Sequence, residues 1–224
     1  MKYDVIIVGA GPGGIFSAYE LLKKEPKLRV AVFEAGHSLE KRHCPIDGDK
    51  VKSCVGCKSC SIMSGFGGAG AFSDGKYNIT NDFGGTLYEY VGRKEAIELM
   101  KYVDGINMEY GGEGTKLYST AGTHFKKICL QNKLNLLDAS VRHLGTDVNF
   151  VVLENLYAKL KDDIDFFFDT PVREIKLAEG GYRICCDDGE YECEKCIVSV
   201  GRSGSKWMEE ACAGLNIPTR SNRV

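Results

Sequence analysis

Residues 1–36 predict an α/β fold with a parallel sheet, and three features of this segment carry the prediction. Two short apolar runs, residues 3–8 and 29–34, have the length and composition of buried strands. Residues 13–24 between them follow a helical pattern. The glycine-rich turn Gly9-Ala-Gly-Pro-Gly-Gly14 joins the first strand to the helix. A strand, a helix and a second strand of these lengths form a βαβ unit, whose strands lie parallel in one sheet.

The glycines of this turn stand where a Rossmann-like, dinucleotide-binding fold needs them. Gly9 allows the tight turn out of the strand, Gly11 leaves room for a pyrophosphate, and Gly14 lets the helix pack close to the sheet. The N-terminus of the helix offers N–H groups to the phosphates. Glu34 follows Gly14 by 20 residues, where an acid can accept hydrogen bonds from a ribose. The residues expected to bind an adenine dinucleotide here are Gly9, Gly11, Pro12, Gly13, Gly14, Glu34 and Ala35.

The composition excludes several classes of protein. With 29 basic and 31 acidic residues the net charge is −2, which gives no reason to expect nucleic acid or an anionic membrane as a partner. No apolar run has transmembrane length, and Val5–Val8 is too short for a signal sequence. We expect a soluble, cytoplasmic protein that acts on a small-molecule substrate or electron acceptor. Its ten cysteines then indicate thiols, a metal site or redox chemistry rather than structural disulfides.

The remaining chain is expected to contain a helical insertion followed by a return to sheet. Residues 37–86 have little periodicity and are interpreted as a long loop. Helical spacing recurs over about 93–109, 122–133 and 148–162, with a polar turn at Arg142–Asp147 before the last helix. Short strands are predicted at Asp165–Asp169, Pro171–Leu177, Tyr182–Cys186 and Lys195–Val200, with a hairpin turn at Glu179-Gly-Gly181.

These patterns predict two parts of the chain. Residues 1–76 and 161–224 are expected to form the nucleotide-binding domain, and residues 77–160 an inserted, mostly helical substrate region. The sequence stops at Asn222-Arg-Val224, soon after a strand and a short helix, and nothing that resembles a closing helix follows them. We therefore expect the chain to be the N-terminal portion of a longer protein.

A second glycine cluster lies at Ser64–Lys76. It contains another Gly-x-Gly-x-x-Gly string, but no apolar strand precedes it and no amphipathic helix follows it directly. Four glycines within six residues let the backbone approach a flat or anionic group closely. The alternative is an ordinary flexible loop, although Ala69 and Ala71 stand where a flexible linker would carry serine or charge.

Taken together, these motifs resemble one family of flavoproteins. The strings Gly9–Gly14, Gly67–Lys76, Arg142–Asp147 and Ile197–Gly204, together with Glu34, are similar to those of the NAD(FAD)-utilising, FAD-dependent dehydrogenases. That family belongs to the glutathione-reductase-like class, and its members are about twice as long as this chain. Their C-terminal half carries a Gly-Asp segment that contacts the FAD and is absent here.

The resemblance implies FAD as the cofactor of the first motif, with NAD(P)H as a candidate electron donor. It places the flavin towards the second glycine cluster, and places Val172 in a segment that meets the adenine. It also matches Gly201 to a glycine near the FAD phosphates and Arg42 to a basic residue near the adenosine; the alternative for Arg42 is a solvated side chain. The further cofactor-binding residues implied are Arg42, Gly67, Gly68, Ala69, Gly70, Ser73, Val172 and Gly201.

The cysteines of the long loop admit three interpretations. Cys54-x-x-Cys57-x-x-Cys60, with Cys44 upstream, has the spacing of ligands to an iron–sulfur cluster or to zinc. A Cys-x-x-Cys pair can instead be a redox-active dithiol, which makes Cys57 and Cys60 candidate catalytic residues. The third interpretation is four reduced cysteines without a function.

His143 is the candidate acid or base, because its pKa ordinarily lies near neutrality. A polar residue that packs at a helix start is an equally good interpretation of this position.

The expected function is therefore an FAD-dependent oxidoreductase or its N-terminal fragment. An NAD(P)-binding dehydrogenase that uses the first motif directly is the alternative among enzymes. A non-catalytic, redox-sensing module built on the cysteines is the alternative of another class. A flavoprotein that modifies RNA is disfavoured by the near-neutral charge.

Overall fold

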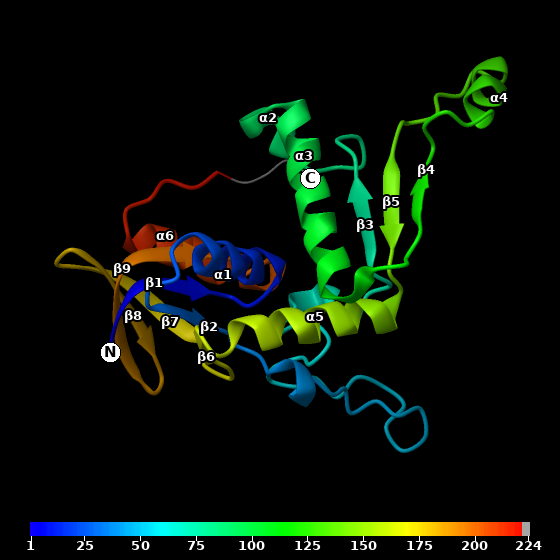
Figure 1. Ribbon diagram of the computed structural model, residues 1–224. Helices are drawn as coiled ribbons and strands as arrows, with labels where there is room; N and C mark the ends of the chain where they lie inside the picture. The colour runs from blue at the N-terminus through cyan, green and yellow to red at the C-terminus, as the bar shows by residue number, and fades with distance from the viewer. Residues whose placement is uncertain (221–224) are drawn as a thin grey trace. The chain divides into compact units, whose positions relative to one another are not determined.

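The computed structural model describes residues 1–220, and Figure 1 shows the course of the chain. The described chain divides into two compact units. The first comprises Met1–Ala71 and Leu156–Val224, and the second comprises Phe72–Asn155. The expectation about the chain's end rests on Asn222–Val224, which lie outside the described residues.

The first unit is built on a six-stranded mixed sheet with the strand order β6-β2-β1-β9-β8-β7. Four strands run parallel, because β1 pairs with β2 and β9, and β2 pairs with β6. Their bounds are Lys2–Val8 for β1, Val30–Phe33 for β2, Asp165–Phe167 for β6 and Gly189–Val198 for β9. The predicted parallel sheet is therefore confirmed, and its fold class with it.

Helix α1 (Pro12–Lys24) connects β1 to β2 and packs against the sheet (Figure 1). Pro12 suits the start of the helix because its fixed φ is already helical and it lacks an N–H that would have no partner there. Gly14, Ile15 and Ala18 form the buried face of α1. A Cβ at Gly14 would collide with the carbonyl oxygen of Gly9, so only glycine allows this close packing. The strand–helix–strand pattern read from the sequence is confirmed.

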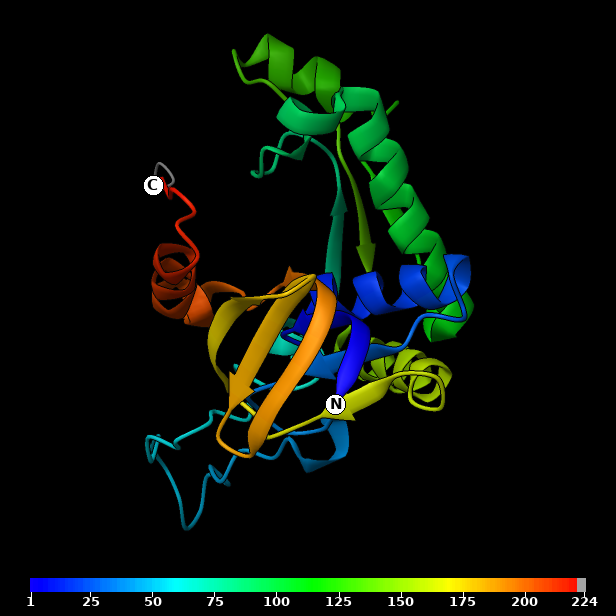
Figure 2. The same cartoon turned by 90° about the vertical axis from the view of Figure 1, so that its left-hand side faces the viewer.

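The other edge of the sheet is an antiparallel meander, which Figure 2 shows as yellow to orange strands. Strand β7 (Val172–Ala178) pairs with β8 (Gly181–Cys186), and β8 pairs in turn with β9. The predicted hairpin turn is confirmed, with Gly180 at a φ of +78°. Helix α6 (Ser205–Gly214) follows β9, and the indole Nε1 of its Trp207 donates to the carbonyl of Arg173 at 3.1 Å.

The core of the first unit lies on both faces of β1 and β2. Ile6 and Ile7 point to opposite faces of β1, and both are completely buried. The ring of Phe33 stacks on Phe167 with 4.6 Å between centroids. This apolar packing fixes β2 and β6 side by side and so positions the carboxyl ends of the parallel strands.

The second unit contains an antiparallel sheet of three short strands in the order β3-β5-β4. Arg142 on β5 forms a largely buried ion pair with Asp104, with 2.8 Å between Nη2 and Oδ2. The strands are β3 (Lys76–Ile79), β4 (Leu117–Ser119) and β5 (Ser140–His143). The helices are α2 (Leu87–Val91), α3 (Arg93–Asn107), α4 (Phe125–Gln131) and α5 (Thr146–Leu160), the last of which continues into the first unit.

The sequence pattern predicted α3, α4 and α5 but missed this sheet. Residues 37–86 are not all loop, since they include β3. Arg142 and His143 belong to β5 rather than to the predicted polar turn. Strands of three or four residues are too short to show an alternating pattern, and these carry polar side chains. Among residues 1–220, no helix is long and apolar enough to cross a membrane.

Tyr3 provides a test of the packing at the start of β1. Its side chain is 2% exposed, and its hydroxyl donates to Asp165 Oδ2 at 2.8 Å. Burial, together with Asp165, raises the pKa of Tyr3 to about 12. Folding therefore opposes ionisation of Tyr3, so its contribution to stability is complete below about pH 10 and is lost as the pH rises towards 12.

We expect Tyr3→Phe to lower the free energy of unfolding by about 1 kcal/mol at pH 8, because one buried hydrogen bond is lost. The difference from wild type should shrink between pH 10 and pH 12, as measured by urea unfolding. Tyr182→Phe, on β8 of the same sheet, serves as the control. A difference that grows with pH would contradict the assignment.

Candidate functional site

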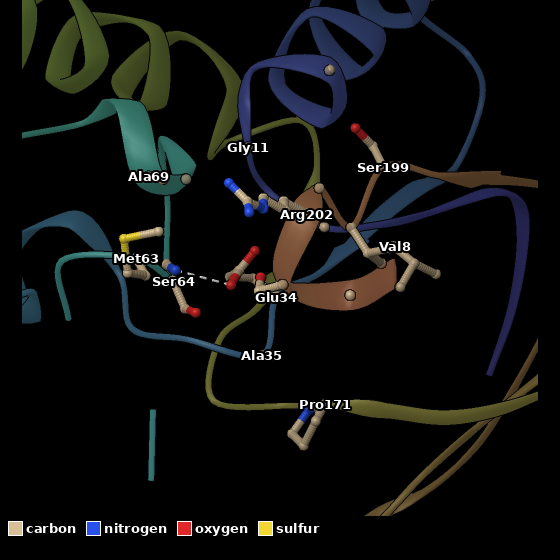
Figure 3. A pocket seen from close by; sticks show the side chains of 18 of the residues that line it. Val8, Gly11, Glu34, Ala35, Met63, Ser64, Ala69, Pro171, Ser199 and Arg202 are labelled. Carbon is tan, nitrogen blue, oxygen red and sulfur yellow. Dashed lines mark hydrogen bonds between the residues drawn. The ribbon is translucent and has the colours of Figure 1, made fainter. Parts of the chain in front are cut away.

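A pocket of the first unit opens at the carboxyl ends of β1 and β9 (Figure 3). From β1 the chain order proceeds to β2 and β6 on one side of the sheet, and β9 lies on the other. Such a switch point leaves a crevice between neighbouring parallel strands, where open α/β sheets bind ligands. The pocket has a volume of about 610 Å³, in the range of small-molecule and cofactor sites.

The first glycine turn packs tightly against the end of β9. Gly9 has a φ of +101°, and a Cβ on it would collide with the carbonyl oxygen of Ser199. A Cβ on Gly13 would collide with the Ser199 hydroxyl. The turn therefore presents backbone rather than side chains to the pocket.

The N-terminus of α1 also faces this pocket, since Gly11, Pro12 and Gly13 line it. No side chain caps the helix. The N–H groups of its first turn have no carbonyl partners within the helix, and the helix dipole adds partial positive charge there. This end of the pocket is suited to an anion such as a phosphate.

The second glycine cluster forms the opposite wall of the pocket. Gly68, Ala69 and Gly70 form a 3-10 turn that lines it. The N–H of Gly67 donates to the carbonyl of Ala10 at 2.8 Å. A Cβ on Gly68 would lie 3.1 Å from the Cα of Gly11, so the two glycine segments are in close contact.

The carboxylate of Glu34 joins three segments of backbone. One oxygen accepts from the N–H of Ala10 at 2.7 Å, and the other accepts from Gly36 at 2.8 Å and Gly65 at 3.0 Å. Glu34 is 7% exposed but still lines the pocket, and Figure 3 shows its carboxylate at the pocket wall. Its first role is therefore to tie the first glycine turn to the second cluster.

Arg42 holds the second cluster from its other side. Its guanidinium donates to four carbonyl oxygens at 2.6–2.8 Å, those of Ser61, Ile62, Phe66 and Gly68. The side chain is buried, which lowers the pKa of Arg42, while the charge of Glu34 opposes that shift. A solvated arginine is thus the wrong interpretation, because all these donors point into the protein.

A cluster of aromatic rings packs against Phe66, which belongs to the second glycine cluster. Phe66 is completely buried, and its ring packs edge-on against Tyr157 at 5.0 Å between centroids. Phe166 and Phe168 surround it at 5.9 and 6.4 Å. The second glycine cluster is therefore a fixed wall and not a flexible loop.

Most of the residues proposed from the sequence come together around this one pocket. Those that line it are Gly9, Gly11, Pro12, Gly13, Glu34, Ala35, Gly68, Ala69, Gly70, Val172 and Gly201. Gly14, Arg42 and Gly67 lie behind its wall and hold it in place. Ser73 is an exposed residue of the second unit, where its hydroxyl accepts from the N–H of Gly75 at 3.3 Å.

Several pocket residues had no role assigned from the sequence. Arg202 brings a guanidinium into the pocket, as Figure 3 shows, and Ser199 closes the end of β9. Met63, Pro171 and Trp207 supply apolar surface. The signal for Arg202 was available, because it directly follows Gly201 at the end of a predicted strand.

The candidate catalytic and metal-binding residues lie outside the pocket lining. His143 ends β5 in the second unit and is exposed. Cys54, Cys57 and Cys60 are exposed thiols, and Cys44 is half-buried. Within residues 1–220, no three His, Cys, Asp or Glu side chains are arranged to hold a metal ion. The long loop between Lys41 and Gly68 has no helix or strand to bring the thiols together.

Comparisons with known proteins agree with this geometry. The family model of the Thi4 family matches residues 1–40. Glycine oxidase from Geobacillus kaustophilus is similar in structure, with a TM-score of 0.55, 17% identity, and coverage of 96% of this chain and 58% of that one. The fold is of the FAD/NAD(P)-binding Rossmann type.

L-amino acid deaminase from Proteus vulgaris also matches, with a TM-score of 0.48, 14% identity, and coverage of 96% and 50% of the two chains. The chain thus spans between half and three fifths of the length of these solved structures. A search of curated proteins found no significant match.

Glu34→Gln tests the role of the carboxylate in holding the two glycine segments. The amide places an NH₂ group where one carboxylate oxygen accepts a backbone N–H, so at least one charged hydrogen bond is lost. We expect the free energy of unfolding to fall by about 2–3 kcal/mol in urea titrations. Glu194→Gln, an exposed change on β9, should leave stability within about 0.5 kcal/mol of wild type. Equal losses of unfolding free energy in the two variants would show that Glu34 does not hold the two glycine segments together.

Proposed function

We propose that this chain is part of an FAD-dependent oxidoreductase and that its pocket binds the adenosine diphosphate portion of FAD. The observation that carries the proposal is the contact between two glycine segments beside the N-terminus of α1. Together they form a groove of bare backbone at the switch point of a parallel sheet. An extended dinucleotide fits this groove, since its pyrophosphate needs close approach to N–H groups.

The space along the groove supports this fit. A Cβ built on Gly70 or Gly201 meets no heavy atom within 4 Å, although both residues line the pocket. Packing within the protein therefore does not require glycine at either position, although the φ of +64° at Gly201 itself favours glycine there. The room that both leave is available to a ligand.

The charges around the groove also suit a diphosphate. Arg202 supplies a cation, and the N-terminus of α1 supplies N–H groups and a positive dipole end. Glu34 still lines the pocket after accepting three backbone hydrogen bonds. Two carboxylate oxygens offer about four acceptor positions, so one is left for a ribose hydroxyl.

The flavin, when bound, supplies hydride transfer, and the chain supplies its position and electrostatics. Residues of this chain would hold the adenosine end, with Val172 and Pro171 against the adenine and Gly11–Gly13 under the phosphates. The finer assignment we propose is an NAD(FAD)-utilising dehydrogenase, with NAD(P)H as the electron donor. It rests on the sequence strings at Gly67–Lys76 and Ile197–Gly204.

Cofactor titration tests this proposal. Purified protein should retain or take up FAD, seen as flavin absorption and quenched flavin fluorescence. ADP should compete with FAD, because the pocket is assigned to the shared diphosphate portion. Tight binding of NAD(P)H by a protein that takes up no FAD would overturn the proposal in favour of an NAD(P)-dependent dehydrogenase.

Gly70→Val probes the groove without disturbing the protein around it. The added side chain meets no protein atom within 4 Å of its Cβ, so the melting temperature should change little. The same side chain narrows the groove, and we expect the affinity for FAD and for ADP to fall at least tenfold, an outcome measured by fluorescence titration. Gly214→Val, also in open space but outside the pocket, is the matched control. Unchanged affinity in Gly70→Val would place the ligand elsewhere.

A further inference from the structure

The loop of residues 43–60 carries a run of thiols that the proposed function does not use. Cys54, Cys57 and Cys60 recur every third residue, and Cys44 lies ten residues before the run. Three thiols at this spacing are typical of ligands to a four-iron cluster, with the fourth ligand from elsewhere in the chain. The exposed thiols of the run are open to an incoming metal, and because no three of them lie together among the described residues, binding has to gather them.

Arg42 closes this loop at its base. The guanidinium donates to the carbonyls of Ser61 and Ile62 at 2.8 Å each. Cys44 is two residues after Arg42, and Cys60 directly precedes Ser61. The two ends of the loop are therefore held together, and with them the chain at the first and last cysteine. The Cys60 side chain also lies near enough to the guanidinium to raise the pKa of Arg42.

The rest of the loop has little packing of its own. Figure 1 shows it in light blue as an excursion without a helix or strand. Ile46 and Val55 are exposed, so these apolar side chains give the loop no core of its own. A tight turn in which Asp47 accepts from the N–H groups of Asp49 and Val51 shapes its tip. Segments of this kind commonly gain their fixed structure when thiolates bind a metal centre.

The charge of the loop compensates for thiolate ligands. Four thiolates around an iron–sulfur core carry net negative charge, which favours nearby cations. The loop contains three lysines, Lys50, Lys52 and Lys58, and Arg42 lies at its base. Its acids are Asp47 and Asp49, so basic residues outnumber acidic ones.

We propose that Cys44, Cys54, Cys57 and Cys60 ligate a four-iron, four-sulfur cluster. The cluster offers each thiolate its own iron atom, whereas a single zinc ion requires all four sulfurs within about 2.3 Å of one point. A run of three thiols over seven residues meets the first requirement more easily. Each thiol gives up its proton when it binds iron.

The proposed cluster lies next to the pocket lining, because a single hydrogen-bonded turn joins Cys60 to two residues of the pocket. The carbonyl of Cys60 accepts from the N–H groups of Met63 at 3.0 Å and Ser64 at 2.8 Å, and both residues line the pocket. The proposal does not depend on the identity of the ligand in the pocket, because metal content is measured apart from any cofactor.

Metal analysis of the protein tests the proposal. The chain is purified without oxygen, reconstituted with ferric iron and sulfide in the presence of a thiol reductant, and assayed for iron, acid-labile sulfide and zinc. We expect about four iron and four sulfide per chain, with a broad visible absorption that bleaches on reduction with dithionite. About one zinc per chain without sulfide would overturn the cluster, as would a metal-free protein.

Single substitutions assign the ligands. Cys54→Ser, Cys57→Ser and Cys60→Ser should each lose most of the iron and sulfide, and Cys44→Ser should do the same. Cys129→Ser changes a half-buried cysteine of α4 and should keep the full content. Full iron content in all four loop variants would overturn the assignment. A disulfide between loop cysteines in protein that, after its reduction, takes up no iron and sulfide would also overturn it in favour of a dithiol.

Discussion

The structure of the candidate site depends on one buried carboxylate. Glu34 ends β2 and accepts N–H groups from the first glycine turn, from its own exit loop and from the second glycine cluster. A buried negative charge needs such partners, because desolvation without them costs several kcal/mol. Glu34 therefore does more than the sequence motif assigns to it. It determines where two separate stretches of backbone meet, and so where the pocket lies.

Arg42 complements this carboxylate and completes the support of the pocket wall. Its four carbonyl acceptors lie in the same segment whose N–H group Glu34 binds. Removing either charge would leave several buried backbone groups without partners, and each such group costs about 1–3 kcal/mol. The buried ring of Phe66 adds apolar packing that holds the second glycine cluster in place. Because the wall is held by the protein alone, a ligand does not spend binding energy on ordering it.

The sequence predicted those parts of the fold whose signals are local. The turn Gly9–Gly14 and the adjoining strands were recognisable because each glycine has a distinct steric task. The hairpin at Gly180 was recognisable from its turn residues. The sheet β3-β5-β4 was not, since pairing of such short strands depends on partners distant in the chain. For the same reason, no local pattern indicated that the Arg42 side chain reaches Ser61, Ile62 and Phe66.

The pairing of β1 with β9 has a consequence for the synthesis of the protein. Lys2 pairs with Glu192, about 190 residues later in the chain. At about 5–20 residues per second, a ribosome needs roughly 10–40 s between the two strands. During that interval β1 exposes one unpaired edge, which is a hazard for aggregation. The nascent first unit must therefore either remain unfolded or be shielded until β9 (Gly189–Val198) has emerged.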